Sequence, residues 1–398
     1  MSNTCTGVMD WAVAAYPELC SVREYLHRHP ELGHQEQQTT SFICEMLRSY
    51  DIPILDLGLS TGVAAKISGD HPGKLLAIRE DIDALPIQEA TGLSFSSQAT
   101  GISHACGHDI HTTALLGCAQ YLAQQRHQLH GEVLLIFQCA EETCDGAQSM
   151  LKKGIFSPIP DGIIGFHCAP ALPLGTIGIL PGICNASCDT ITITVSGTGG
   201  HGAHPEDCVD PIVMSAGLLM QLQTVISRNN CATDPSVLTF GTISGGTAPN
   251  IIPNTVTLCG TLRTFDDSVR HAHLNRICQL SRDFCVAMGG QCTVAIEKGM
   301  PPLINEPKIC EQLESSVKRV LGAKKINKNL KPSMGSDDFS CLLNACNNHG
   351  AQFLLGTAIE SKPNTSLGLH VAENIFPSET LPYGVSALAQ FAVDFLSL

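Results

Sequence analysis

The length, composition and charge of the chain exclude several classes of protein. Its 398 residues are 43% hydrophobic and 15% charged, which is typical of a folded globular protein and leaves room for about two or three domains. The net charge of −14 argues against nucleic acid and anionic membrane surfaces as partners. No apolar run approaches the roughly 18 residues that a membrane span needs.

The cysteines and the N-terminus bear on the cellular compartment. The 19 cysteines include no pair with C-x2-C spacing, so we expect small buried thiols rather than a disulfide scaffold. The first 20 residues lack the basic start and apolar run of a signal peptide. Both features predict a cytoplasmic protein.

The first half of the chain alternates helical patterns with short apolar runs. A run such as GEVLLIFQCA is typical of strands buried in a parallel sheet, so the alternation predicts an α/β sheet with helices on both faces. We expect Asp109 to cap the third helix. The expected helices cover 10–28, 37–50, 112–125 and 143–153, and the expected strands 63–68, 74–82, 131–140 and 162–166.

The pattern changes near Cys184. The segment DTITITVS alternates polar and apolar residues, as a half-buried strand does. Strands at 189–196, 236–244, 254–264 and 291–297, with helices at 210–227 and 267–288, give the order β-α-β-β-α-β of a ferredoxin-like domain.

The tail then resumes the α/β pattern, with a helix at 307–321, a strand at 352–355 and a helix at 379–398. We therefore predict one α/β domain interrupted by a smaller inserted domain. The predicted domain ranges are 1–183, 184–298 and 299–398.

Residues 104–111, His-Ala-Cys-Gly-His-Asp-Ile-His, contain three imidazoles, a thiol and a carboxylate. Cysteine and histidine are ligands that Zn²⁺ prefers. Further candidate ligands follow apolar segments: Glu141 and Glu142, His167, and His370. In open α/β sheets the reactive crevice lies beyond the carboxyl ends of the strands. The sequence thus predicts a metal site at that edge.

Ten motifs give the chain a recognisable signature. In these segments it resembles the aminoacylase and carboxypeptidase family of dinuclear metallohydrolases, in the branch with hippurate hydrolase and the auxin-conjugate amidohydrolases. The motifs are LHRHPELG (26–33), DIDALPI (81–87), HACGHDIHT (104–112), AEE (140–142), GFH (165–167), GGHGAHP (199–205), GTISGGTAPNIIP (241–253), GTLRTFD (260–266), MGSDDFS (334–340) and LH (369–370).

The resemblance implies a zinc-exopeptidase-like catalytic domain that binds two divalent metal ions. Zn²⁺ is favoured, with Mn²⁺, Co²⁺ or Ni²⁺ as alternatives. Glu141 would be the general base for a metal-activated water, and Asp83 would orient an imidazole ligand. Asp81 lies two residues before Asp83 and would face the same side of a strand. Both a structural contact and a functional role remain possible for it. The implied metal ligands are Cys106, His108, Glu142, His167 and His370.

The resemblance also assigns a role to the inserted domain, as a lid and dimerisation domain. His201 would reach the active site of the partner subunit and stabilise the oxyanion of the reaction. Asn250 and Arg263 would hold the carbonyl or carboxylate of the substrate, since arginine grips carboxylates through two parallel hydrogen bonds. We therefore expect a homodimer or a higher oligomer.

The expected activity is metal-dependent hydrolysis of N-acyl amino acids to a carboxylic acid and a free amino acid. The main alternative is a metallo-carboxypeptidase or dipeptidase that acts on short peptides. An alternative of another class is a metal-buffering or scaffold protein, suggested by 19 cysteines and 16 histidines. The scattered spacing of the cysteines argues against it, because a buffer needs ligand clusters.

Overall fold

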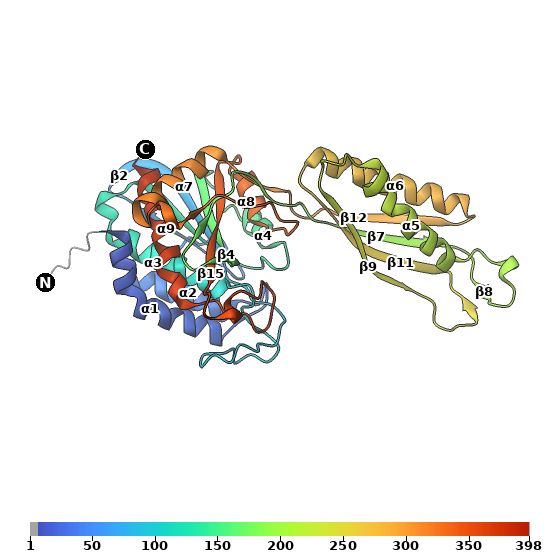
Figure 1. Cartoon of the computed structure of the whole chain (residues 1–398), viewed down its shortest axis with the longest axis horizontal. Coiled ribbons are helices and arrows are strands. Elements are labelled where there is room, and N and C mark those ends of the chain that lie inside the picture. The colour runs from blue at the N-terminus through green and yellow to red at the C-terminus, as the bar shows by residue number, and fades with distance from the viewer. Residues whose placement is uncertain (1–6, 398) are drawn as a thin grey trace. The chain divides into compact units, whose positions relative to one another are not determined.

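The computed structural model describes residues 7–397, which form two compact units (Figure 1). The first unit contains the chain up to Gly182, Ile304–Lys331 and the chain from Asp338 onward. The second contains Ile183–Leu303 and Pro332–Asp337. The sequence-based ranges change domain at 183/184 and 298/299, close to these limits, and did not separate the 332–337 segment. No helix within 7–397 has the length and apolar character needed to cross a membrane.

A seven-stranded mixed sheet forms the centre of the first unit. Four neighbours at its middle, β3, β2, β4 and β15, run parallel. Strands β1 and β5 add antiparallel partners. In spatial order the strands are β1 (Val63–Ser68), β3 (His130–Gln138), β2 (His71–Asp81), β4 (Gly162–Pro173), β15 (Gly350–Ala358), β5 (Ile177–Gly178) and β14 (Ile326–Asn327).

Helices cover both faces of this sheet. A Cβ added at Gly162 would meet Phe395 of α9, whereas one added at Gly165 would meet Phe339 of α8. Positions three apart in a strand point to opposite faces, so α9 and α8 lie on different faces. The helices of this unit are α1 (Val8–Arg28), α2 (Gln37–Ser49), α3 (His108–Gln124), α4 (Gly146–Lys152), α7 (Pro307–Val320), α8 (Phe339–Ala345) and α9 (Leu381–Leu396).

The second unit is a four-stranded antiparallel sheet packed against two helices. Its strand order is β12 (Gln291–Glu297), β7 (Asp189–Ser196), β11 (Thr255–Thr264) and β9 (Ser236–Gly245). Every second side chain of β7 is buried against α5 (Pro211–Asn229) and α6 (Asp267–Ala287), as the alternating sequence predicted. Short strands β8 (Gly200–His201) and β10 (Ile251–Ile252) pair with each other, as do β6 (Gly182–Asn185) and β13 (Leu303–Asn305).

The α/β class is confirmed, and three local predictions were wrong. Helix α3 begins at His108, and its N-cap is Gly107 rather than Asp109, whose buried side chain bonds to Arg23 and His27. Helix α4 begins only at Gly146. Strand β4 continues to Pro173, beyond the expected end at 166. Helix α8 and the strands β5, β6, β8, β10, β13 and β14 were missed because they are too short to show a clear periodicity.

Candidate metal centre

The first ligand segment is shaped by a glycine between two candidate ligands. Gly107 has φ of +90°, a region that side chains other than glycine rarely enter. A Cβ there would also lie 3.1 Å from Phe376 and 3.2 Å from Cys168. Cys106 therefore precedes a left-handed turn, and His108 opens helix α3 immediately after it.

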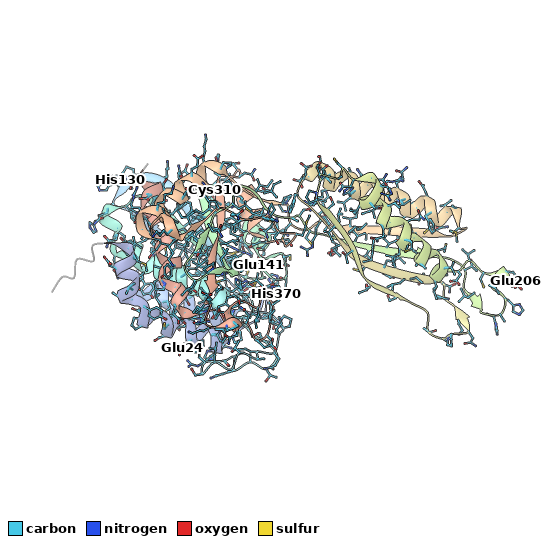
Figure 2. All side chains as sticks on the ribbon, viewed as in Figure 1. Glu24, His130, Glu141, Glu206, Cys310 and His370 are labelled. Carbon is cyan, nitrogen blue, oxygen red and sulfur yellow. The ribbon has the colours of Figure 1, made fainter. Side chains whose placement is uncertain are left out.

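The other candidate ligands come from the turn after β3, the middle of β4 and one long loop. Glu141 and Glu142 follow β3. His167 lies on β4, which is parallel to β3 and separated from it by β2. His370 lies in the loop after β15, and its backbone N–H donates to the carbonyl of Ala105 at 2.9 Å. That bond fastens the loop to the 104–111 segment. Figure 2 labels Glu141 and His370 in this unit.

Two groups of ligand atoms share one cysteine. Cys106, His108 and His167 form one group, and Cys106, Glu142 and His370 form another, with the ligand atoms of each within 4.8 Å of one another. The Cys106 Sγ lies 3.4 Å from Nε2 of His167. Nε2 of His370 lies 3.4 Å from Oε1 of Glu142. A thiolate common to both groups suits two neighbouring cations rather than one closed site, for which four ligands suffice.

Two polar atoms at this site have only long ion-pair contacts within residues 7–397. Nε2 of His108 lies 3.8 Å from Oε1 of Glu142, and neither atom has a hydrogen-bond partner among these residues. Their burial is costly unless a ligand satisfies them. Burial, followed by the charges of Glu142 and Glu141, raises the pKa of the Cys106 thiol well above its usual value. A divalent cation would reverse that effect and favour the thiolate. The residues therefore fit a metal site.

Asp83 holds one imidazole in a defined orientation. Nδ1 of His108 lies 2.9 Å from the Asp83 carbonyl and 3.2 Å from its Oδ1. Nδ1 therefore carries a proton, and Nε2 is left to face the ligand atoms. Burial alone would lower the pKa of His108, but Asp81 and Asp83 raise it to about 10.

Asp81 contacts protein groups, and its Oδ1 also lies 3.6 Å from Nε2 of the candidate ligand His108. Its Oδ1 accepts from Nδ1 of His111 at 2.6 Å, and its Oδ2 lies 3.0 Å from Nη1 of Arg79. The backbone N–H of Cys168 donates to Nε2 of His111. Both nitrogens of His111 are thus occupied by protein groups, and Asp81 and His111 brace the strand ends.

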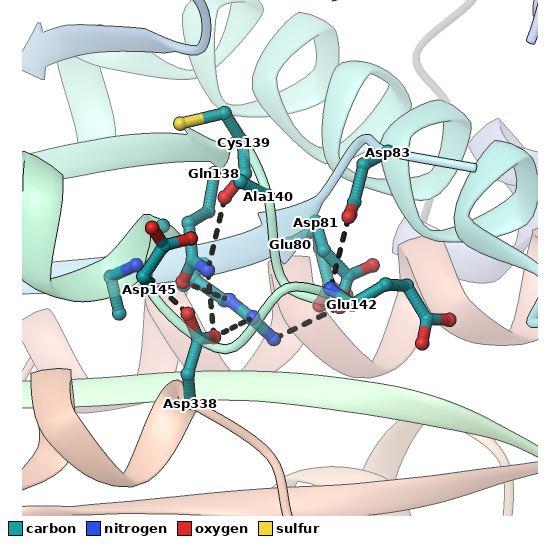
Figure 3. Close-up of polar contacts among 12 residues, drawn as sticks. Glu80, Asp81, Asp83, Gln138, Cys139, Ala140, Glu142, Asp145 and Asp338 are labelled. Atoms are coloured by element: carbon teal, nitrogen blue, oxygen red, sulfur yellow. Dashed lines mark hydrogen bonds and ion pairs between the residues drawn. The ribbon is translucent and has the colours of Figure 1, made fainter. Parts of the chain in front are cut away.

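A buried arginine was missed by the sequence analysis. Arg79 donates to Gln138 at 2.8 Å and to Asp338 at 3.0 Å, in addition to its ion pair with Asp81. Figure 3 labels these three partners. Asp338 also accepts from the backbone N–H of Ala147. The available signal was a charged residue inside the apolar strand LLAIRED, since a buried charge requires a partner.

The remaining predicted site residues belong to the second unit. His201 is exposed on β8, opposite Ile251 of β10, and the adjacent Gly202 N–H donates to the Asn250 carbonyl. Nη1 of Arg263 donates to the Met334 carbonyl and the Ser336 hydroxyl, each at 3.0 Å. His201 and Asn250 therefore lie on neighbouring segments, while Arg263 contacts the 332–337 segment.

Fold and site together define a metallohydrolase of the α/β class. Residues 77–394 match the model of Peptidase family M20/M25/M40, and the chain belongs to this family of amide-bond hydrolases. Membership in an enzyme family argues against the alternative of a metal buffer or scaffold.

Three known proteins illustrate the similarity. The chain is 41% identical to N-acetyl-L-cysteine deacetylase of Bacillus subtilis, over 73% of this chain and 70% of that protein. It is 33% identical to thermostable carboxypeptidase 1 of Saccharolobus solfataricus, over 99% of this chain and 98% of that protein. The crystal structure of Bacillus subtilis YXEP protein, described as a dinuclear metal binding peptidase, has a TM-score of 0.84 at 32% identity and covers 97% of this chain and 99% of its own.

Proposed function

We propose that the protein hydrolyses the amide bond of N-acyl amino acids and releases a carboxylic acid and a free amino acid. The observation that carries this proposal is the pair of ligand groups joined at Cys106, with Glu141 in a further group with His108 and Glu142. The deacetylase activity named for the Bacillus subtilis relative supports the substrate class.

The chain's own residues would divide the work as follows. Cys106, His108, Glu142, His167 and His370 would hold two divalent ions. When bound, such ions polarise a carbonyl and lower the pKa of water toward neutrality. Glu141 would accept a proton from the attacking water and deliver it to the leaving amine.

The identity of the ions follows from the donor set only in part. A thiolate with imidazoles favours Zn²⁺, while Mn²⁺, Co²⁺ and Ni²⁺ also accept mixed sets with carboxylates. We propose Zn²⁺ first.

The second unit would supply substrate contacts and the subunit interface. We propose a cytoplasmic homodimer in which His201 stabilises the oxyanion in the partner's site. Asn250 and Arg263 would hold the carbonyl or carboxylate of the substrate, although Arg263 would have to share its guanidinium with Met334 and Ser336.

A second candidate keeps the same site and changes the substrate. The relative from Saccharolobus solfataricus is named a carboxypeptidase and matches nearly the whole chain. A metallo-carboxypeptidase or dipeptidase activity on short peptides is therefore the alternative.

Turnover of N-acetyl, N-benzoyl and N-indoleacetyl amino acids, compared with dipeptides, separates the two candidates. We expect at least one acyl class to be cleaved faster than every dipeptide. A profile restricted to dipeptides would refute the first candidate in favour of the second.

The role of Glu141 is tested by Glu141→Gln, which keeps the shape of the side chain and removes the base. We expect turnover to fall by about 10²–10⁴-fold, the usual contribution of general base catalysis. Bound metal, measured by elemental analysis on protein purified without chelators, should stay near two ions per chain. Loss of metal together with activity would show that the base is assigned to the wrong residue.

A further inference from the structure

The turn that carries Glu141 has a strained backbone. Ala140 precedes it with φ of +54°, a conformation that is strained for a residue other than glycine and persists only where its surroundings enforce it. Ala140 is fully buried. This backbone conformation sets the path by which the chain enters Glu141.

Carboxylates from two distant segments hold the amides on either side of Glu141. Oε1 of Glu36 accepts from the Ala140 N–H at 2.8 Å. Oδ2 of Asp83 accepts from the Glu142 N–H at 3.0 Å. Glu36 lies just before helix α2 and is fully buried, so its carboxylate reaches the turn from inside the protein.

Close packing confines the same turn. A Cβ added at Gly33, three residues before Glu36, would lie 3.2 Å from the Ala140 Cα. At the other end, a Cβ on Gly146 would lie only 1.7 Å from the Cys139 carbonyl oxygen. Within the turn, Cys144 N–H donates to the Glu141 carbonyl at 2.8 Å. The backbone therefore has little room for an alternative path while its amide bonds are kept.

From these contacts we propose that Glu36 is a positioning residue for catalysis: its bond to Ala140 keeps the 140–142 turn in the strained conformation that aims Glu141. The inference rests on the proposed role of Glu141 as the base. Glu36 contacts neither the candidate ligands' side chains nor the reacting groups in this account. Glu142, a candidate ligand on the same turn, is held separately by the bond from its N–H to Asp83. Loss of Glu36 should therefore affect the rate of the chemical step more than substrate binding or metal content.

The variants are chosen to separate the hydrogen bond from the fold. Glu36→Ala removes the acceptor, and Glu36→Asp withdraws it by one methylene while keeping a carboxylate. Glu36→Gln retains an oxygen acceptor on a side chain of the same length. Glu31→Ala is the matched control, since Glu31 lies on the same segment and accepts from Gln38 and Thr39 at the start of α2.

We expect kcat to fall by about 10–100-fold in Glu36→Ala and Glu36→Asp, as displacing a reacting group by about 1 Å can do. KM and bound metal should be unchanged, and Glu36→Gln should recover kcat to within about threefold of the wild type. Glu31→Ala should keep the wild-type kcat. If Glu36→Ala does not fold, Glu36→Asp and Glu36→Gln still give the comparison.

Hydrogen–deuterium exchange supplies a readout that does not depend on turnover. Peptides that span 139–143 should exchange faster in Glu36→Asp and Glu36→Ala than in Glu36→Gln or Glu31→Ala. Unchanged exchange, or faster exchange with unchanged kcat, would overturn the proposal. A fully active Glu141→Gln would instead overturn the base assignment, and the exchange result would still report on the Glu36 bond.

Discussion

At the scale of residues, buried charges at the start of α3 are paired across long sequence distances. Asp109 accepts from Arg23 at 2.8 Å and from His27 at 2.9 Å, and the other His27 nitrogen lies 3.2 Å from Glu89. Burial would lower the pKa of His27, but Asp109 and Glu89 raise it overall. Burial likewise opposes ionisation of Glu89, yet hydrogen bonds from His27 and Ser97 lower its pKa to about 2.

These shifts predict a pH-dependent effect of Glu89→Gln. The lowered pKa of Glu89 stabilises the fold above its unfolded value of about 4.5, and this contribution is lost as the pH falls toward 2. The raised pKa of His27 stabilises the fold below about 6.5 and loses its effect as the pH rises through the folded value. The charged pair of Glu89 and His27 therefore stabilises the fold most between about pH 4.5 and pH 6.5.

Thermal unfolding of Glu89→Gln and the wild type should consequently differ more at about pH 5.5 than at about pH 9. An equal loss of Tm at both values would mean that the charge of His27 contributes nothing. The exposed pair of His34 and Asp145, 2.8 Å apart, provides a control, because Asp145→Asn at an exposed pair should change Tm little at either pH.

A second prediction concerns the cysteine common to both ligand groups. Cys106→Ala removes a ligand from each group, whereas His370→Ala removes one from a single group. We expect Cys106→Ala to lower the affinity for both ions and His370→Ala to spare one. Elemental analysis after dialysis against a weak chelator measures this difference, and equal metal loss in both variants would contradict a shared thiolate.

At the scale of elements, helix starts and tight turns determine where side chains point. Helix α5 begins with a side-chain cap, in which Asp210 accepts from Ile212 N–H at 2.8 Å and from Val213 N–H at 3.4 Å. Helix α3 instead begins after a left-handed glycine. The first arrangement stabilises a helix, and the second directs Cys106 and His108 to the candidate metal centre.

The cap of α5 predicts a measurable loss of stability. Asp210→Ala should lower the free energy of unfolding of the second unit by about 1 kcal/mol, because two backbone donors lose their acceptor. Asp283→Ala, an exposed position within α6, should cause no such loss. Denaturant titration followed by circular dichroism compares the two, and an unchanged midpoint for Asp210→Ala would show that water replaces the cap at no cost.

At the scale of the whole molecule, each unit has a hydrophobic core of its own. The first core lies between the seven-stranded sheet and its helices, and the second lies between the four-stranded sheet, α5 and α6. All five candidate metal ligands and Glu141 belong to the first unit, whereas His201, Asn250 and Arg263 belong to the second. This division is what makes the proposed exchange of His201 between subunits testable.

Complementation between inactive chains tests that exchange. If His201 acts in the partner's site, chains with His201→Ala and chains with Glu141→Gln should regain activity when mixed, up to about a quarter of the wild-type value for random pairing into two-site dimers. Each variant alone should stay inactive. No recovery after confirmed subunit exchange would indicate that each site is built within one chain.

Local chemistry in the sequence was enough for much of this protein. The strands 63–68, 189–196 and 291–297 were predicted with their observed limits, because period-two patterns and apolar runs report burial directly. The candidate ligands were found because cysteine, histidine and paired glutamates after apolar strands have few structural uses.

Only the tertiary structure decided which of these side chains meet. The structure shows that Cys106 belongs to both ligand groups, that Asp81 bonds to His111 and Arg79, and that Glu36 reaches Ala140 across more than a hundred residues. Such contacts depend on strand order and on left-handed turns at Gly107 and Ala140. Neither leaves a periodic signal, since both result from packing between segments far apart in the chain.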